Sequence, residues 1–411
     1  MASTTRPLAG IKVLDLSRIL AGPVCCQVLA DLGADVVKVE RPGTGDDTRQ
    51  WGPPFLPPAA GEGEHGPSAY FLSANRGKRS LAVDLAHPHA AELLDDLVKA
   101  ADVLVENFLP RSLGRLGLDP DRLLRLNPRL VVVCVSGYGR TSSQADVPGY
   151  DLVVQAAAGL MSITGEPEGE PMKVGVAITD VITGLYAAIS ALAGLHRVAA
   201  EGAGMALDLA LTDCTLASLV NVAQGALLTG QRPRRYGNAH PHIVPYEAFA
   251  TSDGFLVLAV GNDRQWQRFC QAAGRTDLSA DERFATNPQR VAHRDELIPK
   301  LLAVMRGRST AAWLAALGDA DVSCAPVAPL DEVLVSRQAA ERGMVTEVRD
   351  AAGRRYRLLN SPIHSTGKPL PDATPPPALG QHSGEVLRQW LGYDEQRIER
   401  LRAAGAIAGN E

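Results

Sequence analysis

The chain has 411 residues, 45% of them hydrophobic, which predicts a globular protein with a large core and more than one domain. Its 41 basic and 46 acidic residues are interspersed and give a net charge of -5, so no broad basic field exists to bind nucleic acid. The six cysteines lack metal-ligand or CxxC spacing, and the first residues form no apolar signal region. No uncharged apolar run reaches the roughly 18 residues of a membrane span. We therefore expect a soluble, cytoplasmic protein with reduced cysteines, no metal and no permanently bound cofactor.

The first half of the chain predicts an α/β fold. Residues 12–16 and 35–40 are typical of buried strands, and residues 25–32 are typical of the helix between them. Three further strands are expected over residues 80–85, 102–106 and 130–135. One further helix is expected over residues 89–100. This alternation predicts a Rossmann-like domain with a parallel sheet of six or so strands. The turn after the first strand lacks GxGxxG, which disfavours an NAD enzyme.

The second half of the chain changes in character. A hairpin is expected over residues 246–250 and 255–260, with helices near residues 263–273 and 294–306, and together these predict a smaller α+β domain. Two segments are rich in proline. Residues 52–67 predict a surface loop, and residues 368–379 predict an extended strap that crosses between domains. The expected boundaries give a large Rossmann-like domain over residues 1–224, a small α+β domain over residues 225–330, and a C-terminal segment over residues 331–411 that returns to the large domain.

One carboxylate, that of Asp180, lies between two apolar runs. Residues 174–178 resemble a strand, residues 181–195 carry no charged side chain, and Thr179 and Asp180 are residue types preferred where a helix begins. Such a carboxylate can cap the helix, or it can be a partly desolvated nucleophile at the positive end of the helix dipole. Spacing alone favours the cap.

Short motifs along nearly the whole chain resemble the class III CoA-transferase family, of the formyl-CoA transferase and carnitine dehydratase type. They lie in a fixed order at residues 7–16, 20–23, 32–43, 75–80, 105–108, 136–139, 149–151 and 380–382. Within the family, the succinyl-CoA:glutarate CoA-transferase members are most similar, through residues 46–55, 159–165, 240–246 and 286–291. The resemblance implies an interlocked homodimer whose substrates are an acyl-CoA and a carboxylic acid.

The resemblance places the family's nucleophilic aspartate on Asp180. It implies that Asp180 attacks an acyl-CoA thioester to give a mixed anhydride, that CoA thiolate returns to give aspartyl-CoA, and that an acceptor acid then takes the CoA. A carboxylate suits this role because its reference pKa is about 3.9, and thiolate leaves without a metal because a thiol pKa is about 8.5. Water must be excluded from the anhydride, and the glycine-containing loop 237–242 is a candidate for closure.

The resemblance also implies the residues that bind CoA and the acid. The family's CoA positions match Ile19, Arg41, Val83, Asn107, Phe108 and Arg115. A dicarboxylic acid further needs a cation for its remote carboxylate, because burying that group unpaired is costly. Arg18 and Arg76 are the candidates for this cation, and His240 is a candidate hydrogen-bond partner for the acid.

Two other functions remain open from the sequence. An α-methylacyl-CoA racemase-like isomerase needs a histidine where this chain has Tyr150, between Gly149 and Asp151, so its base is missing. A non-catalytic acyl-CoA-binding protein would keep Arg41 and would have no need of Asp180. The donor and acceptor acids are not identified, because discrimination of one methylene is worth only about 1–3 kcal/mol and depends on pocket shape.

Overall fold

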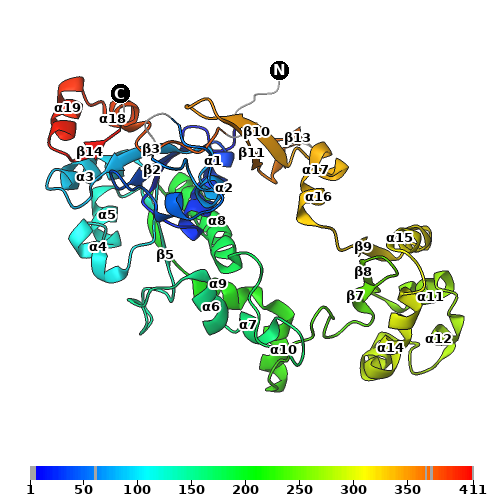
Figure 1. Cartoon of the computed structure of the whole chain (residues 1–411). Coiled ribbons are helices and arrows are strands. Elements are labelled where there is room, and N and C mark those ends of the chain that lie inside the picture. Colours follow the sequence, from blue (N-terminus) through cyan, green and yellow to red (C-terminus); the bar gives the residue numbers. More distant parts are fainter. Residues whose placement is uncertain (1–5, 60–62, 366–367, 371–373, 410–411) are drawn as a thin grey trace. The chain divides into compact units, whose positions relative to one another are not determined.

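The computed structural model describes residues 6–59, 63–365, 368–370 and 374–409, and the chain forms two compact units (Figure 1). The first unit comprises residues 1–160, 174–229 and 337–411. The second comprises residues 161–173 and 230–336. Each unit has a hydrophobic core of its own.

The first unit is built on a seven-stranded sheet with the order β14-β3-β2-β1-β4-β5-β6. Six strands are parallel, and the edge strand β14 pairs antiparallel with β3. The strands are β1 (Lys12–Asp15), β2 (Asp35–Glu40), β3 (Arg79–Val83), β4 (Val103–Glu106), β5 (Val131–Ser136), β6 (Met205–Ala210) and β14 (Ile407–Ala408). This confirms the predicted α/β class with a mainly parallel sheet.

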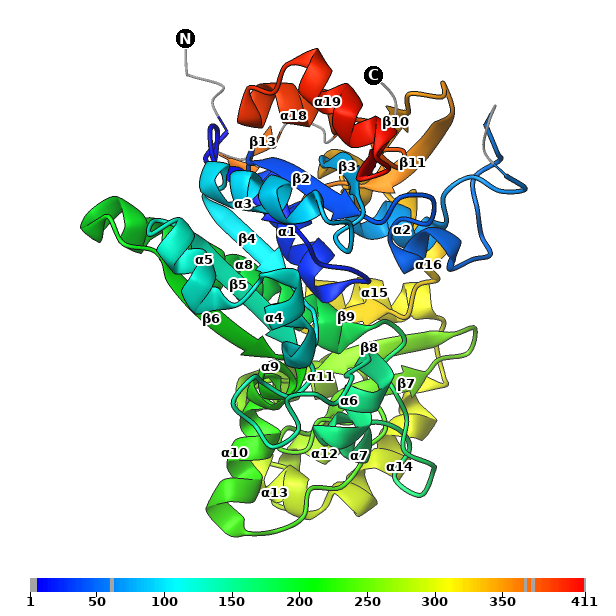
Figure 2. The same cartoon turned by 90° about the vertical axis from the view of Figure 1, so that its left-hand side faces the viewer.

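Helices cover both faces of this sheet because successive strand residues point to opposite sides. Leu14 and Val37 pack with α3, α5, α18 and α19, whereas Val13 and Val36 pack with α1 and α8. Figure 2 shows α3, α4 and α5 in front of the strands. The helices are α1 (Ala21–Asp31), α2 (Ala69–Ala74), α3 (Ala90–Ala100), α4 (Pro110–Leu116), α5 (Pro120–Leu126), α6 (Asp151–Ala157), α8 (Ile178–Glu201), α9 (Leu211–Ser218), α10 (Val220–Thr229), α17 (Arg337–Glu341), α18 (Ser383–Leu391) and α19 (Glu395–Ala403), with a 3-10 turn η1 (Asp47–Gln50).

The C-terminal part of the first unit also contains two small antiparallel pairs. They are β10 (Val345–Arg349) with β11 (Arg355–Leu359), and β12 (His364–Ser365) with β13 (Lys368–Pro369). The predicted proline-rich strap falls in this region, and part of it, residues 371–373, lies outside the described residues. Ser383 Oγ accepts from Ala82 N at 3.1 Å, which ties the C-terminal segment to β3.

The second unit combines a three-stranded antiparallel sheet with helices. The strands are β7 (Tyr246–Ala250), β8 (Phe255–Ala259) and β9 (Ser323–Pro326), in the order β7-β8-β9. The helices are α11 (Asp263–Ala272), α12 (Thr276–Ala280), α13 (Asn287–Ala292), α14 (Arg294–Met305), α15 (Thr310–Asp319) and α16 (Leu330–Leu334). Its core contains the fully buried Trp266 and Trp313. The predicted hairpin and its two flanking helices are confirmed.

Two expectations differ from the structure. Residues 174–178, predicted as a strand, form none, because the segment runs irregularly into the first residue of α8. Residues 161–173, which include most of α7 (Leu160–Ile163), belong to the second unit rather than to the large one.

By length and composition, helix α8 could cross a membrane. It is the one unbroken helix among the described residues that is long and apolar enough to do so. Its apolar character has a different use here. The helix packs on α1 and on β5, and Ala187, Ala188 and Ala191 are buried in that contact. Small side chains allow the helix to lie close to the sheet, so α8 is a core helix whose first turn carries Asp180.

Candidate active site

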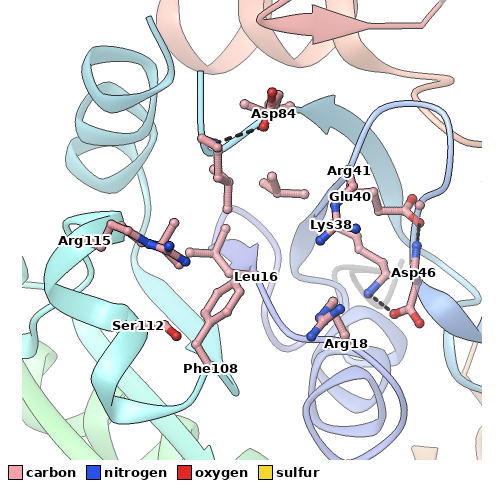
Figure 3. A pocket seen from close by; sticks show the side chains of 16 residues that line it. Leu16, Arg18, Lys38, Glu40, Arg41, Asp46, Asp84, Phe108, Ser112 and Arg115 are labelled. Atoms are coloured by element: carbon pink, nitrogen blue, oxygen red, sulfur yellow. Dashed lines mark hydrogen bonds and ion pairs between the residues drawn. The ribbon is translucent and has the colours of Figure 1, made fainter. Parts of the chain in front are cut away.

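One cavity of about 290 Å³ opens in the first unit where β1, β2 and β4 end (Figure 3). Arg41 directly follows β2, Phe108 is the second residue after β4, and Arg115 lies on α4. Figure 3 shows Arg115 and Arg41 on opposite walls, with Leu16 and Phe108 between them. The edge formed by the carboxyl ends of parallel strands is the usual place for a nucleotide, and these cations and this ring suit phosphate groups and a base.

A second cavity, of about 310 Å³, shares Arg18 and Phe108 with the first. Its other lining residues include Ile19, Asn107 and Asp180. The two shared residues make the cavities neighbours, so a long ligand can have its charged end near Arg41 and its reactive end near Asp180.

Asp180 is the third residue of α8, and its side chain does not cap the helix. Asp151, the first residue of α6, does that instead: its Oδ1 accepts from Thr179 N at 2.9 Å and from Thr179 Oγ1 at 2.6 Å. Gln155 Nε2 donates to the other carboxylate oxygen of Asp151 at 2.7 Å. The capping interpretation of Asp180 is therefore wrong, because Asp151 satisfies the end of the helix and leaves the Asp180 carboxylate for another use.

The surroundings of Asp180 disfavour its charge. Only 8% of the residue is exposed, and it lines the second cavity. Burial, followed by the negative charge of Asp151, raises the pKa of Asp180 to about 7, although a hydrogen bond from the backbone N–H of Ala21 acts in the opposite direction. The sequence had led us to expect a carboxylate with its ordinary pKa, and this expectation needs correction. Near neutral pH the anion of Asp180 is therefore less favoured than that of an exposed aspartate.

Two side chains hold the turn between β1 and α1. Asn107 brackets one peptide of the turn, accepting from Arg18 N at 2.9 Å and donating to Arg18 O at 2.8 Å. Ile19 has φ 72°, a left-handed conformation that is unfavourable for a β-branched residue. Its N–H donates to the carboxylate of Asp46 at 3.2 Å. Ile19 lies in this turn and Asn107, which follows β4, holds it, so the two residues are fixed relative to each other.

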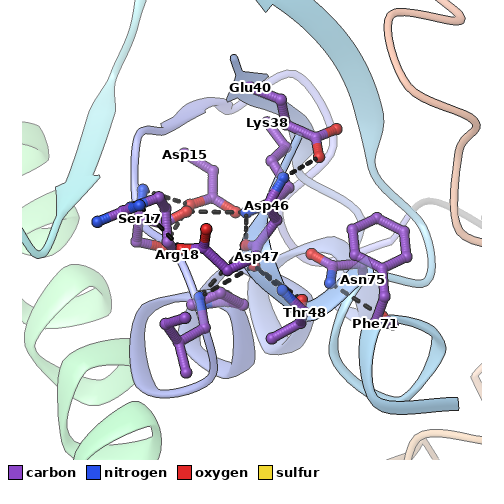
Figure 4. A network of polar contacts seen from close by, with 12 residues as sticks. Asp15, Ser17, Arg18, Lys38, Glu40, Asp46, Asp47, Thr48, Phe71 and Asn75 are labelled. Carbon is purple, nitrogen blue, oxygen red and sulfur yellow. Dashed lines mark hydrogen bonds and ion pairs between the residues drawn. The ribbon is translucent and has the colours of Figure 1, made fainter. Parts of the chain in front are cut away.

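Buried ion pairs lie beneath this turn (Figure 4). Lys38 Nζ lies 2.8 Å from Asp46 Oδ2, and both side chains are fully buried. Lys38 also donates to Ser17 O at 2.8 Å, while Asp15 accepts from Ser17 N at 3.0 Å and pairs with Lys78 at 2.9 Å. Burial opposes ionisation of Asp46, but Lys38 outweighs it and holds the pKa of Asp46 at about 2.

All six residues predicted to bind CoA line one of the two cavities. Arg41, Val83, Phe108 and Arg115 line the first, and Ile19, Asn107 and again Phe108 line the second. Arg18, a predicted acid-binding residue, lines both, and its guanidinium lies 2.9 Å from Asp47.

Arg76 is placed elsewhere. Only 7% of the residue is exposed, and its guanidinium pairs through two nitrogens with the buried carboxylate of Asp31. It is not among the lining residues of either cavity. Its charge is already compensated inside the protein, which argues against the expected role of Arg76 in binding the acid.

His240 belongs to the second unit, in the loop that was predicted to close over the site. Arg294 donates to His240 O at 2.6 Å, and Asn287 Nδ2 donates to His242 O at 2.9 Å. Burial, followed by His242 and Arg294, lowers the pKa of His240. The loop is thus tied to α13 and α14 of its own unit, and a role of His240 in acid binding stays a prediction.

Sequence reasoning missed two residues near Asp180. Asp151 was considered only as the neighbour of Tyr150 in a triplet without histidine. Tyr70, on α2, lies within electrostatic reach, because burial followed by Asp180 and then Asp151 raises the pKa of its phenol to about 12. Nothing in the local sequence signals either contact. Among the described residues, no group of three or more His, Cys, Asp or Glu side chains could hold a metal ion.

Comparison with known proteins gives a consistent match. Residues 8–383 match the family model described as CoA-transferase family III. The chain is 42% identical to the succinate–glutarate CoA-transferase of Agrobacterium fabrum over 389 residues, which cover 95% of this chain and 97% of that protein. It is 38% identical to the succinyl-CoA:glutarate CoA-transferase of Mus musculus over 406 residues, covering 99% and 91%. Among solved structures, a CAIB/BAIF family protein from Brucella suis aligns with a TM-score of 0.81 and 40% identity, over 93% of this chain and 99% of that one.

Proposed function

The chain belongs to CoA-transferase family III and is a CoA-transferase, and from this premise we propose that it moves CoA from succinyl-CoA to a glutarate-like dicarboxylic acid through Asp180. The names of the two relatives support the choice of donor and acceptor. The observation that carries the proposed route is the buried carboxylate of Asp180, which caps no helix and lines a cavity that shares Arg18 and Phe108 with a cationic one.

In the proposed first step, an oxygen of the Asp180 carboxylate attacks the thioester carbonyl carbon of the donor. The carbon–sulfur bond breaks, CoA leaves as thiolate, and Asp180 becomes a mixed anhydride with the donor acid. The thiolate then attacks the side-chain carbonyl carbon of Asp180 and releases the donor carboxylate, leaving aspartyl-CoA thioester. The acceptor carboxylate attacks this thioester, and return of thiolate to the acceptor's acyl carbon gives the new acyl-CoA and restores Asp180.

The raised pKa of Asp180 suits this route. An anion held in an apolar site with one N–H donor, that of Ala21, is poorly stabilised and hence more nucleophilic than a carboxylate in water. The aspartyl anhydride also retains the transfer potential of a thioester, which a serine ester would lose. The amount of anion falls below pH 7, so the proposed reaction slows in acid.

The first cavity supplies the proposed CoA site. Arg41 and Arg115 provide the charge for phosphate groups, and Phe108 provides a ring for stacking. Phe108 N donates to Glu106 at 2.9 Å, so the backbone that carries this ring is fixed.

Arg18 is the cation proposed for the remote carboxylate of the acid. It lines the cavity that contains Asp180, and its pair with Asp47 is half exposed and therefore weak enough to be exchanged for a substrate carboxylate. Arg18→Ala should raise the KM for glutarate at least about tenfold and leave the KM for valerate, a monocarboxylate of the same length, within about twofold. An equal loss for both acids would instead assign Arg18 to CoA.

Covalent trapping tests the proposed route itself. Wild-type protein is mixed with succinyl-CoA and hydroxylamine, digested, and mapped by mass spectrometry. We expect a hydroxamate at Asp180. We expect none when succinyl-CoA is replaced by succinate, with no CoA present. Turnover with no adduct at Asp180, in the presence of enough hydroxylamine to compete with the acid, would reject the anhydride route.

We also propose that the protein acts as the interlocked homodimer that the resemblance implies. Exposed apolar side chains on α9 and α10 support association, with Leu216, Leu227 and Leu228 each more than half exposed. Light scattering after size exclusion should give twice the chain mass of 43.5 kDa. A monomer that turns over at the full rate would contradict this.

A further inference from the structure

The turn between β1 and α1 stores backbone strain at a place where the reaction is proposed to occur. Ile19 is one of three non-glycine residues with positive φ among the described residues, and the only one of these that lines a cavity containing Asp180. A β-branched residue in this conformation persists only where its surroundings determine it. The groups that surround Ile19 are charged and buried, and the strained turn borders the proposed reaction site, which suggests that the strain has a functional role.

Asp46 is the group that holds Ile19. Its carboxylate accepts from Ile19 N, from Thr48 N at 2.9 Å and from Thr48 Oγ1 at 2.7 Å, and it pairs with Lys38. Asp46 is only 1% exposed. It begins the 46–55 motif that the proposed reaction has not otherwise used.

The turn determines where α1 begins. Leu20 precedes the helix, and Ala21 is its first residue, so the Ala21 N–H is one of the helix donors without a partner in its own helix. Ala21 and Asp180 line the same cavity, and a hydrogen bond from the Ala21 backbone acts on the carboxylate of Asp180. The contact needs close packing: a Cβ on Gly184, one turn after Asp180, would lie 2.7 Å from Ala21 O.

We propose that Asp46 is a positioning residue of the transfer reaction, which holds the turn at Ile19 so that the Ala21 N–H stays directed at the carboxylate of Asp180. The donor stabilises the anion that attacks the thioester and fixes its orientation. Asp46 touches no reacting atom, and Lys38 serves to keep Asp46 ionised and in place. This inference rests on the proposed function, because it assigns a partner to the proposed nucleophile.

The test is the pH profile of kcat/KM for Asp46→Asn. Removal of a nearby negative charge alone would move the acid limb of the profile to lower pH. Loss of the Ala21 donor moves it to higher pH, and we expect a rise of about half a unit or more together with a fall in kcat of about tenfold. The titratable or charged groups that face Asp180 or its cavity, Asp151 from α6, Tyr70 from α2 and Arg18 from the turn, are unchanged in this variant.

Ile19→Gly gives the same test without changing any charge, and it decides the matter if Asp46→Asn does not fold. Glycine adopts positive φ without strain, so the turn can relax while the backbone is not destabilised. The same upward move of the acid limb is expected. Asp321→Gly is the matched control, because Asp321 also has positive φ, is exposed, lies in the second unit and lines neither cavity. Its kcat and pH profile should equal those of wild type.

An acid limb that stays in place or moves to lower pH in folded Asp46→Asn or Ile19→Gly protein would overturn the positioning role. A uniform loss of activity with an unmoved limb has the same meaning, because it shows a structural role only. Failure of the proposed function is separate, since it would appear as wild-type turnover without an Asp180 adduct.

Discussion

Two buried aspartates in the first unit have opposite properties. Asp46, beside the first cavity, has a pKa of about 2, and Asp180, in the second, has a pKa of about 7. Burial raises the pKa of both. Asp46 lies 2.8 Å from the ammonium of Lys38, whereas the charge that shifts the pKa of Asp180 is the carboxylate of Asp151. The partner, rather than the extent of burial, decides which carboxylate is a fixed structural anion.

This difference separates what holds the site from what reacts in it. An aspartate paired with a buried lysine is too well stabilised to attack a carbonyl carbon. One that lacks a cation is costly to ionise and correspondingly reactive. The experiments below break or sharpen this contrast.

Asp180→Asn should have the largest effect. The amide has no anionic oxygen to form the anhydride, so transfer from succinyl-CoA should fall about 10⁴-fold or more, to background. The control is Asp213→Asn, because Asp213 is likewise the third residue of a helix, α9, but is exposed and lines neither cavity. It should keep wild-type turnover in the same assay. A fully active Asp180→Asn protein would end the assignment of Asp180.

Asp180→Asn should also raise the free energy of unfolding above that of wild type at alkaline pH. The pKa of Asp180 is raised from 3.8 in the unfolded chain to about 7 in the folded one, so the protonated form is favoured in the fold. That stability is fully present below pH 3.8 and is lost as pH rises through 7. Asp180→Asn removes the loss, so it should gain up to a few kcal/mol over wild type at pH 8 and about none at pH 4. Urea unfolding at both pH values measures this.

Arg76→Ala should affect stability rather than substrate choice. The variant leaves the carboxylate of Asp31 buried without its cation, which should lower the free energy of unfolding by about 3–5 kcal/mol. Arg197→Ala is the control, because the pair of Arg197 with Glu201 is about half exposed and should be worth less than about 1 kcal/mol. The KM for glutarate should change less than about twofold. A selective rise in that KM would return Arg76 to the acid site.

Most strands of the large sheet could be predicted from the sequence, but not all of them. A parallel sheet was predictable because its strands are short apolar runs separated by helices of regular period. The strand β6 was missed because its residues alternate between exposed and half-buried, with Asp208 in the middle. Residues 174–178 are apolar, but apolar character alone does not distinguish a strand from the approach to a helix.

Site residues were predictable where a motif places them and not where a distant partner decides their role. Arg76 meets Asp31 across 45 positions, and Asp151 reaches Thr179 across 28. Such pairings depend on how α1, α2, α6 and α8 pack, which no local pattern encodes. The sequence therefore identified Asp180 as a candidate residue. It did not show that another residue caps helix α8.

Arg115→Ala should weaken CoA binding while leaving the chemistry intact. Loss of one phosphate contact should raise the KM for succinyl-CoA about tenfold and change kcat by less than about threefold. The effect should shrink at high salt, because the partner is an anion near the surface. Arg125→Ala on α5 is the control, since Arg125 is exposed and lines neither cavity. A fall in kcat with unchanged KM would place Arg115 near the reacting atoms instead.

Asp151→Asn should give the smallest change and the most specific one. The amide can still accept from Thr179, so the start of α8 keeps its cap, but the negative charge beside Asp180 is removed. The pKa of Asp180 should then fall, and the acid limb of kcat/KM should move to lower pH. Burial is the larger cause of the raised pKa, so the move should be less than half of the whole shift, about one unit or so. At pH 6 the variant should therefore be relatively more active than wild type, whereas an upward move would show that Asp151 supports the anion of Asp180 through positioning and not through charge.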